Sequence, residues 1–254
     1  MGFPQHLDYL KGREITWFNP CWGYFGFWKR FFEFQNEFDI GVEEAWKHRA
    51  MKRNKEMYVS AIMALAMKQD TGEEWWFTKP AQDPPDALIG TIKSEEKTGG
   101  NLMSVRELEI VECLDGPLSE TIQKKLLGKH KRYEPNTALV CLLSPSDIVG
   151  YDFRELVKEL AAYNLPLDHI FCVFHGCLQS SLSPEMPINF VFEQLKNVVL
   201  IQLSPVYSEV IVAPSDVCGL FLGGEDKGWL RFEGRGTKGG FRDVSLIHPP
   251  ELFD

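Results

Sequence analysis

The most constraining feature of the sequence is the apolar run ALVCLL at residues 138–143. A strand with one face in water alternates apolar and polar residues, whereas a strand that is buried on both faces does not. This run contains no charged or strongly polar residue, and the run IFCVF at residues 170–174 repeats the pattern. Two such strands predict a sheet that is covered on both faces, which is typical of α/β proteins.

Three segments show the composition or the end signals of helices. Good helix formers fill residues 42–69, and Gly72 is expected to stop that helix. Ser119 and Asp152 are expected to cap two later helices, which extend to residues 132 and 163. In the helix after Ser119, the side chains expected to face the core are Ile122, Leu126 and Leu127.

Strand patterns lie between these helices and after the last of them. They lie at residues 74–78, 86–92, 104–114, 138–143, 170–174, 198–203 and 209–212. The polar connection at residues 93–101 carries Gly99-Gly100, as a hairpin loop would. The resulting order of helix, three strands, helix, strand, helix and strand predicts an α/β fold with a mixed central sheet flanked by helices.

The two ends of the chain differ from this central part. Residues 15–38 hold 11 aromatic side chains, and charged residues interrupt them at a spacing that predicts an amphipathic helix at about residues 24–38. We expect their rings to belong to the core or to an interface with a second copy of the chain or another protein. Three parts are therefore expected: an aromatic-rich N-terminal helical region at residues 1–45, an α/β core at residues 46–176, and a β-rich C-terminal extension at residues 177–254 that packs on the core.

Composition limits the classes of protein to which the chain can belong. The 254 residues contain no apolar run of about 18 residues and no signal-peptide pattern at the start, so we expect a cytoplasmic protein with no membrane partner. The six cysteines are scattered without a CxxC pair, which favours buried, reduced thiols. The net charge of −9 argues weakly against a surface coated by nucleic acid, although the distribution of charge matters more than the sum.

Acidic residues occupy particular places in the predicted hairpin. Asp86 lies where a proline-rich linker enters one strand, and Glu107, Glu109 and Glu112 lie in the next strand. Because strand side chains alternate between faces, Glu107 and Glu109 project together and away from Glu112. Asp86 can then meet Glu109 across the two strands. Such oxygen ligands suit Mg²⁺ or Mn²⁺, so we expect a metal site at Asp86 and Glu109 with Glu107 as a further ligand; ordinary exposed acids on an edge strand are the competing interpretation.

The string DPPDALIG at residues 83–90 and the string LEIVE at residues 108–112 resemble the motifs of the PD-(D/E)XK nuclease superfamily. The expected order of elements over residues 55–143 is similar to the core of that superfamily, which implies a restriction-endonuclease-like mixed sheet. The resemblance implies that Asp86 is the first metal-binding acid and Glu109 the second. It also implies that Glu56, in the helix upstream, is a further acid of the catalytic site.

One position departs from the motif of the superfamily, because Val111 stands where the motif has a lysine. Members that lack this lysine can supply one from the following helix. The resemblance therefore implies that Lys125 is the catalytic lysine, with Lys124 in reserve. Lys125 shares a helical face with Ile122 and Lys129, at a spacing of three and four residues.

Two segments carry clusters of basic residues that are expected to contact phosphates. The side chains assigned to nucleic-acid binding are Arg49, Arg53, Lys124, Lys129, Lys131 and Arg132. Together with the acids they imply a metal-dependent nuclease that hydrolyses phosphodiester bonds, with DNA as the expected substrate. Solvated helix faces are the competing interpretation for each cluster.

Two other functions stay open at the level of the sequence. A catalytically inactive relative could keep the fold for binding or assembly and use the aromatic N-terminal region as its interface; the missing strand lysine and the acidic net charge favour it. The string HIFCVFHGC at residues 169–177 is a weaker zinc-site candidate, because its spacing fits no standard zinc pattern.

Overall fold

The computed structural model describes residues 15–80, 85–95, 100–113, 117–127, 133, 136–143, 152–163, 165–167, 169–175, 198–214, 217, 220–226 and 229–234. The helices are α1 (Pro20–Phe38), α2 (Val42–Lys47), the 3₁₀ helix η2 (Arg49–Met51), α3 (Lys52–Thr71), α4 (Leu118–Leu126) and α5 (Phe153–Ala161). The strands are β1 (Trp75–Thr78), β2 (Ala87–Glu95), β3 (Gly100–Cys113), β4 (Thr137–Leu143), β5 (His169–His175), β6 (Val198–Ser204), β7 (Ser208–Val212), β8 (Leu220–Asp226) and β9 (Trp229–Gly234). From α3 to β5 the order of elements confirms the order predicted from the sequence.

Seven strands form one mixed sheet whose spatial order follows the chain from β1 to β7. Strand β2 is antiparallel to β1 and β3, whereas β3, β4 and β5 run parallel to one another. Parallel neighbours need a crossover connection, and α4 and α5 lie in these two connections. Strands β6 and β7, which the sequence places in the C-terminal extension, continue the sheet in antiparallel fashion, and β8 pairs with β9 in a separate small sheet.

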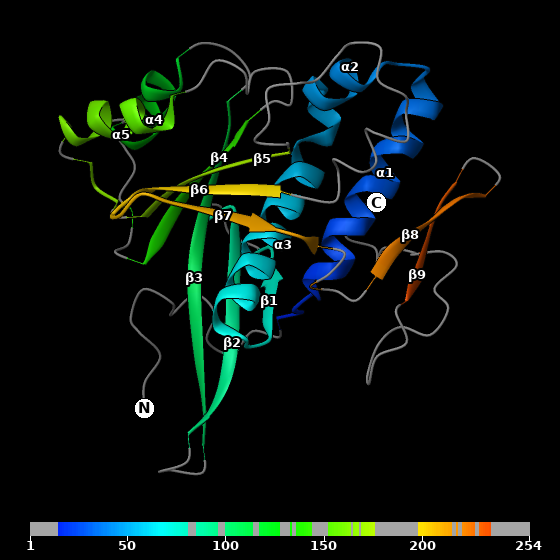
Figure 1. Cartoon of the computed structure of the whole chain (residues 1–254), viewed down its shortest axis with the longest axis horizontal. Helices are drawn as coiled ribbons and strands as arrows, with labels where there is room; N and C mark the ends of the chain where they lie inside the picture. Colours follow the sequence, from blue (N-terminus) through cyan, green and yellow to red (C-terminus); the bar gives the residue numbers. More distant parts are fainter. Residues whose placement is uncertain are drawn as a thin grey trace.

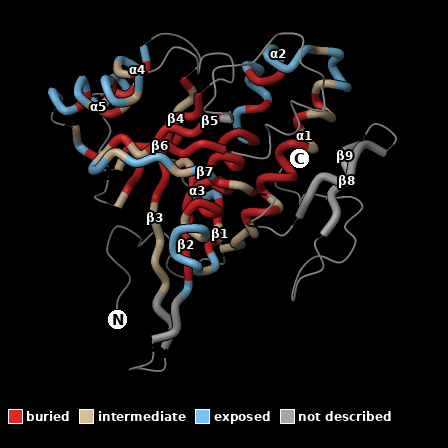
Figure 2. Tube along the Cα trace, viewed as in Figure 1, coloured by how far each residue is buried: buried red, intermediate tan, exposed pale blue. Residues whose placement is uncertain are grey.

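The large sheet lies between two helical layers (Figure 1). Helices α1 and α3 pack on one face and helices α4 and α5 on the other, so β3, β4, β5 and β6 contribute side chains to two cores. In β4, for example, Val140 faces α1 and α3, whereas Cys141 faces α4 and α5. Every residue of β4 is buried, as Figure 2 shows for the centre of the sheet, which confirms the prediction of a strand covered on both faces.

The aromatic residues of α1 form the core of the first layer. Asn19 caps the helix by accepting a hydrogen bond from the backbone N–H of Cys21, and Pro20 suits the first turn, so the helix begins earlier than the predicted residue 24. The ring centroid of Phe27 lies 4.4 Å from that of Tyr58 on α3 and 5.9 Å from that of Trp46 on α2. Most rings of α1 therefore lie in the core, which is one of the two places expected for them, whereas Phe38 is 53% exposed.

Two predicted helices differ from those in the structure. The segment predicted as one helix over residues 42–69 is broken at His48, whose backbone is extended and whose Nδ1 accepts a hydrogen bond from the N–H of Ala50. Helix α4 begins after Pro117, so Ser119 lies inside it rather than capping it. The described part of α4 ends at Leu126, and the adjoining Leu127 is exposed rather than buried as expected.

Two predicted helix ends are confirmed. Gly72 ends α3 with a φ of 70°, a left-handed conformation that glycine adopts readily, and its N–H donates to the carbonyl of Lys68. Asp152 caps α5 by accepting hydrogen bonds from the N–H groups of Arg154 and Glu155. Among the helices of the described residues, none combines the length and the apolar character needed to cross a membrane.

The cysteines follow the sequence-based expectation in part. Cys113, Cys141 and Cys172 are buried free thiols, as predicted. Cys21, in the first turn of α1, is disulfide-bonded, which corrects the expectation of reduced thiols throughout. The pairing was not predictable, because a disulfide depends on the approach of two residues in space and not on their spacing in the sequence. Cys177 and Cys218 lie outside the described residues.

Candidate functional site

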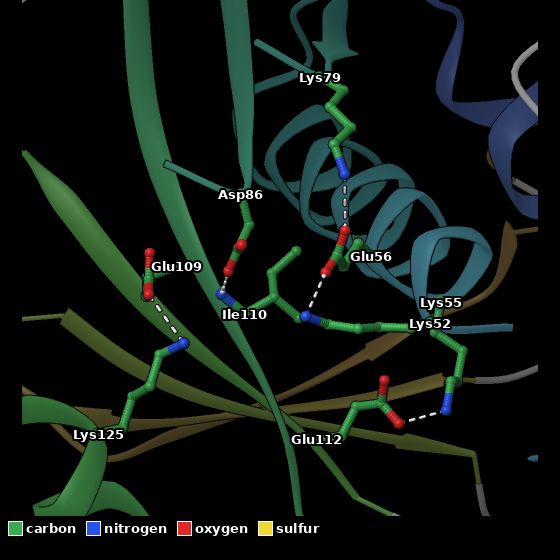
Figure 3. A network of polar contacts seen from close by, with 9 residues as sticks. All are labelled: Lys52, Lys55, Glu56, Lys79, Asp86, Glu109, Ile110, Glu112 and Lys125. Carbon is green, nitrogen blue, oxygen red and sulfur yellow. Dashed lines mark hydrogen bonds and ion pairs between the residues drawn. The ribbon is translucent and has the colours of Figure 1, made fainter. Parts of the chain in front are cut away.

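Asp86 and Glu109 belong to neighbouring strands of the sheet. Ala87, the first residue of β2, pairs with Leu108 of β3, so Asp86 immediately precedes the strand at the level of Glu109. The carboxylate of Asp86 accepts a hydrogen bond from the backbone N–H of Ile110, and the Oδ2 to N distance is 2.7 Å (Figure 3). The β2–β3 pairing thus fixes one carboxylate beside the other, as the sequence predicted.

Glu109 is almost completely buried on the face of β3 that is covered by α4. Its residue exposure is 1%, and its neighbours Leu108 and Ile110 pack on the opposite face with α1 and α3. This is the alternation predicted for the strand. Lys125 on α4 places its Nζ atom 2.8 Å from Oε1 of Glu109. The lysine expected from the helix therefore does reach the second acid, and Lys125 rather than its neighbour Lys124 makes the ion pair.

The environment of Asp86 disfavours its ionised form. Burial raises the pKa of the Asp86 carboxyl above its usual value, and the hydrogen bond from the N–H of Ile110 opposes this rise. The carboxylates of Glu109 and Glu56 raise this pKa further, whereas the Lys125 ammonium lowers it. A cation placed between Asp86 and Glu109 would offset the cost of burying the charged Asp86 carboxylate. It would also offset the repulsion between the two carboxylates.

Glu56 projects from α3 toward the same group of residues. Its side chain is 8% exposed, and its carboxylate is held by two lysines, one on each oxygen. Nζ of Lys79 lies 2.9 Å from Oε2, and Nζ of Lys52, one helical turn earlier on α3, lies 3.6 Å from Oε1. Figure 3 shows these lysines on the α3 side of Asp86, opposite Lys125. Glu56 therefore does lie near Asp86, but two ammonium groups already compensate its charge.

Glu107 shares the face of Glu109 but has a different partner. It is buried, and its Oε2 accepts a hydrogen bond from the hydroxyl of Thr137 on β4 at 3.1 Å. Among the described residues, no group of three or more His, Cys, Asp or Glu side chains could hold a metal ion. The three-acid ligand set predicted for Asp86, Glu107 and Glu109 is therefore not formed. The physical reason is that side chains two residues apart on a strand are separated by about 7 Å.

A second buried ion pair lies on the other face of β3. Lys55 of α3 is 1% exposed, and its ammonium donates to the carboxylate of Glu112 and to the backbone carbonyl of Trp46. The sequence correctly placed Glu112 on the face opposite Glu109, but it did not identify Lys55 as its partner. Lys52 and Lys79 were also missed as neighbours of the site. The spacing of four residues between Lys52 and Glu56 was a usable signal, whereas no local signal pointed from Lys79 to Glu56.

The basic residues assigned to nucleic acid fall into two sets. Arg49, Arg53 and Lys124 are exposed, as a contact with phosphates requires. Lys129, Lys131 and Arg132 lie outside the described residues.

The zinc-site candidate at residues 169–177 does not gather its ligands where they are described. Cys172 is fully buried against α4 and α5, whereas the ring of His169 stacks beside Phe171, whose side chain faces the other core. The two side chains therefore project from opposite faces of β5, as strand alternation requires. The side chain of His175 and residue Cys177 lie outside the described part.

Comparison of the chain with protein-family models, with curated proteins and with solved structures finds no match. The geometry of the residues is therefore the basis for assigning chemistry. Asp86 and Glu109 are two adjacent, largely buried carboxylates, and hard divalent cations such as Mg²⁺ are commonly held by one or two carboxylates together with substrate phosphates. Such a cation would also offset the charge repulsion at Asp86, so this pair of residues fits Mg²⁺ or Mn²⁺.

Proposed function

We propose that the chain is a metal-dependent nuclease that hydrolyses phosphodiester bonds of DNA at Asp86, Glu109 and Lys125. The observation that carries this proposal is the ion pair between Lys125 and the buried Glu109, formed beside Asp86 on the adjoining strand. Two acids, one just before β2 and one in β3, together with a lysine of α4, are groups that can hydrolyse a phosphodiester when they lie near one another.

The arrangement of elements supports the same proposal. Helix α3, strands β1 to β3, helix α4 and strand β4 follow one another in the order for which the PD-(D/E)XK resemblance was noted. Asp86 immediately precedes β2, the middle strand of the first three, and Glu109 lies in β3, the third. Val111 packs toward α4, the helix that carries Lys125. The helix thus supplies a positive charge on the face of the strand where the motif of that superfamily has its lysine.

Each residue of the site has a definable role in the proposed reaction. Asp86 and Glu109 would hold a divalent cation, which supplies Lewis-acid stabilisation of charge on the phosphate. Lys125 would orient the attacking water and offset the negative charge that develops on the oxygens of the phosphate. In the hydrolysis, the water oxygen bonds to phosphorus, the bond from phosphorus to the leaving sugar oxygen breaks, and a proton from the water ends on that oxygen.

Cleavage of DNA by the purified chain tests the proposal. We expect DNA to be cut when Mg²⁺ or Mn²⁺ is present and to stay intact when EDTA removes the cation. Glu109→Ala and Asp86→Ala should each abolish the cutting. Full Mg²⁺-dependent cutting by either variant would show that the assignment of these acids is wrong.

The second candidate function is a nuclease-like fold that serves in binding or assembly without catalysis. Each acid of the pair is engaged within the chain, Asp86 by the N–H of Ile110 and Glu109 by Lys125, and this self-contained arrangement favours the second candidate. An interface at α1 would have to use residues other than Phe27, Phe31 and Phe34, which are buried in the core. Thermal unfolding separates the two functions. A nuclease site should raise Tm with Mg²⁺ or Mn²⁺ and lose this response in Asp86→Asn, whereas an assembly domain should show no response.

A further inference from the structure

The two lysines on Glu56 differ from the other lysines of the site in their exposure. The side chain of Lys125 is 22% exposed and that of Lys55 is 2% exposed, whereas the Lys79 and Lys52 side chains are 35% and 66% exposed. Glu56 itself is almost buried beneath them. Two ammonium groups around one carboxylate leave one net positive charge at a place that solvent can reach.

This positive charge lies next to the proposed catalytic acids. Glu56 lies beside Asp86, as Figure 3 shows. Figure 3 shows Lys79 and Lys52 converging on Glu56 on one side of Asp86, while Lys125 approaches Glu109 on the other side. If one phosphate of a nucleic-acid strand lies at Asp86 and Glu109, the next phosphate of that strand would lie within reach of the flexible Lys52 and Lys79 side chains.

The charges of six side chains at the site bear on its attraction for phosphates. Three carboxylates, those of Asp86, Glu109 and Glu56, face three ammonium groups, those of Lys125, Lys52 and Lys79. With all six ionised, the group is neutral. A divalent cation would leave two positive charges, and each phosphodiester carries one negative charge. With a divalent cation bound, these six groups would therefore attract the negatively charged phosphodiesters of a nucleic-acid strand.

We propose that Lys52 and Lys79 form a binding subsite for the phosphodiester that adjoins the one hydrolysed, so that the substrate is a nucleic-acid strand and not a single phosphodiester. This inference rests on the proposed nuclease function and assigns the substrate class of the same site. Glu56 is then a positioning residue. It holds the two ammonium groups near Asp86 until a phosphate becomes their partner.

Equilibrium binding of DNA tests this subsite without depending on cleavage. The probe is a fluorescein-labelled DNA duplex of about 20 base pairs, roughly two helical turns, whose anisotropy is followed in EDTA at several salt concentrations. Lys79→Ala and Lys52→Ala should each weaken binding about fivefold at low salt. A plot of log affinity against log salt has a negative slope. Each variant should make this slope less steep by about one, because one phosphate contact is lost.

Two further variants separate a phosphate contact from a structural role. Lys68→Ala removes a comparable ion pair at the other end of α3, where Nζ of Lys68 lies 2.7 Å from Oε1 of Glu74, and it should leave both the affinity and the slope unchanged. Glu56→Gln keeps both lysines and removes the charge that occupies them, so it should strengthen DNA binding about twofold to fivefold. A merely structural role for the lysines predicts no such increase.

The outcomes distinguish this subsite from the nuclease function itself. If Lys52→Ala and Lys79→Ala bind DNA with the wild-type slope, or if the wild-type chain does not bind the duplex, the subsite is excluded. If the two lysine variants keep the wild-type slope but the chain still cleaves DNA in Mg²⁺ in a way that depends on Glu109, the nuclease proposal is retained and only the subsite is lost. Conversely, if the lysine variants show a less steep slope but the wild-type chain does not cleave DNA, Lys52 and Lys79 still contact phosphate, and the catalytic assignment is wrong.

Discussion

Lys125 and Glu109 form an ion pair of 2.8 Å across the space between α4 and β3. The carboxylate is almost fully buried, so the lysine that reaches it from the helix compensates its charge in surroundings where water contributes little. Val111, two residues farther along the strand, is apolar and packs toward the same helix. The positive charge on this face of the sheet therefore comes from α4 and not from the strand.

Removing this charge should reduce catalysis strongly. Lys125→Met keeps most of the apolar side chain and removes the ammonium group, so we expect kcat/KM for DNA cleavage to fall by about 10²-fold or more. Lys158→Ala is the control, because Lys158 forms an ion pair with Glu155 on the exposed side of α5. Rates measured at saturating Mg²⁺ separate this effect from weaker cation binding. Cleavage by Lys125→Met within about threefold of the wild-type rate would be at odds with a catalytic role for the lysine.

The raised pKa of Asp86 makes both cation binding and stability depend on pH. An acid whose pKa is higher in the folded state binds protons more tightly there, so its contribution to stability is present at low pH and is lost as pH rises through the folded-state value. A divalent cation competes with that proton. We expect Mg²⁺ to raise Tm more at about pH 8 than at about pH 5.

The isosteric variant of Asp86 checks the sign of this effect. Asn at position 86 can still accept the hydrogen bond from the N–H of Ile110, but it carries no charge toward Glu109 and Glu56. Without divalent cations, Asp86→Asn should raise Tm at about pH 8 by about 2–4 °C. At acidic pH, where Asp86 is protonated in both states, the difference should vanish. A lower Tm at about pH 8 would show that the ionised Asp86 stabilises the fold instead.

Lys55 and Glu112 should matter for stability and not for catalysis. Glu112→Ala leaves the buried Lys55 ammonium without its acid, so we expect the free energy of unfolding in urea to fall by about 2–4 kcal/mol. The double variant Lys55→Met with Glu112→Gln removes both charges and should recover most of this loss. The cleavage rate per folded molecule should stay near the wild-type value in each variant. A loss below about 0.5 kcal/mol in Glu112→Ala would mean that the pair does not hold α3 on the sheet.

Gly23 allows α1 to pack closely against α3 and β1. A Cβ atom at this position would lie 2.5 Å from the ring of Phe77 and 2.8 Å from Cβ of Ala61, which is closer than such atoms approach in proteins. Gly23→Ala should therefore lower the free energy of unfolding by about 1–3 kcal/mol, although alanine is the better helix former. Gly41→Ser is the matched control, because a Cβ there meets no atom within 4 Å. Equal stability of Gly23→Ala and wild type would contradict this close packing.

The parts of the fold that follow from local pattern were predictable from the sequence. The unbroken apolar run of β4 indicated burial on both faces, and the alternation along β3 placed Glu107 and Glu109 together. The order from α3 to β5 followed from these periodicities. The break at His48 was not predictable in this way, because neither proline nor glycine marks it and helix formers continue on both sides.

The candidate site was predictable where it depends on strand register and not where it depends on the approach of separate elements. Asp86 and Glu109 follow from the pairing of two strands joined by a hairpin. Lys125 was reached through a resemblance to a family motif, and its contact with Glu109 is a matter of how α4 packs on the sheet. The contact of Lys79 with Glu56 joins residues that lie 23 positions apart, and no local pattern encodes it.

Cleavage of one labelled DNA by wild-type chain, Asp86→Asn, Glu109→Gln and Lys68→Ala, side by side in Mg²⁺ and in EDTA, is the most direct measurement of the proposed function. Both acid variants retain the approximate shape of the side chain, so lost activity would report lost charge and not a lost fold. We predict cutting by wild type and Lys68→Ala in Mg²⁺, no cutting by either acid variant, and none by any of the four in EDTA. Equal cutting by wild type and Glu109→Gln, or no Mg²⁺-dependent cutting by the folded wild-type chain, would contradict the assignment of a nuclease site to Asp86, Glu109 and Lys125.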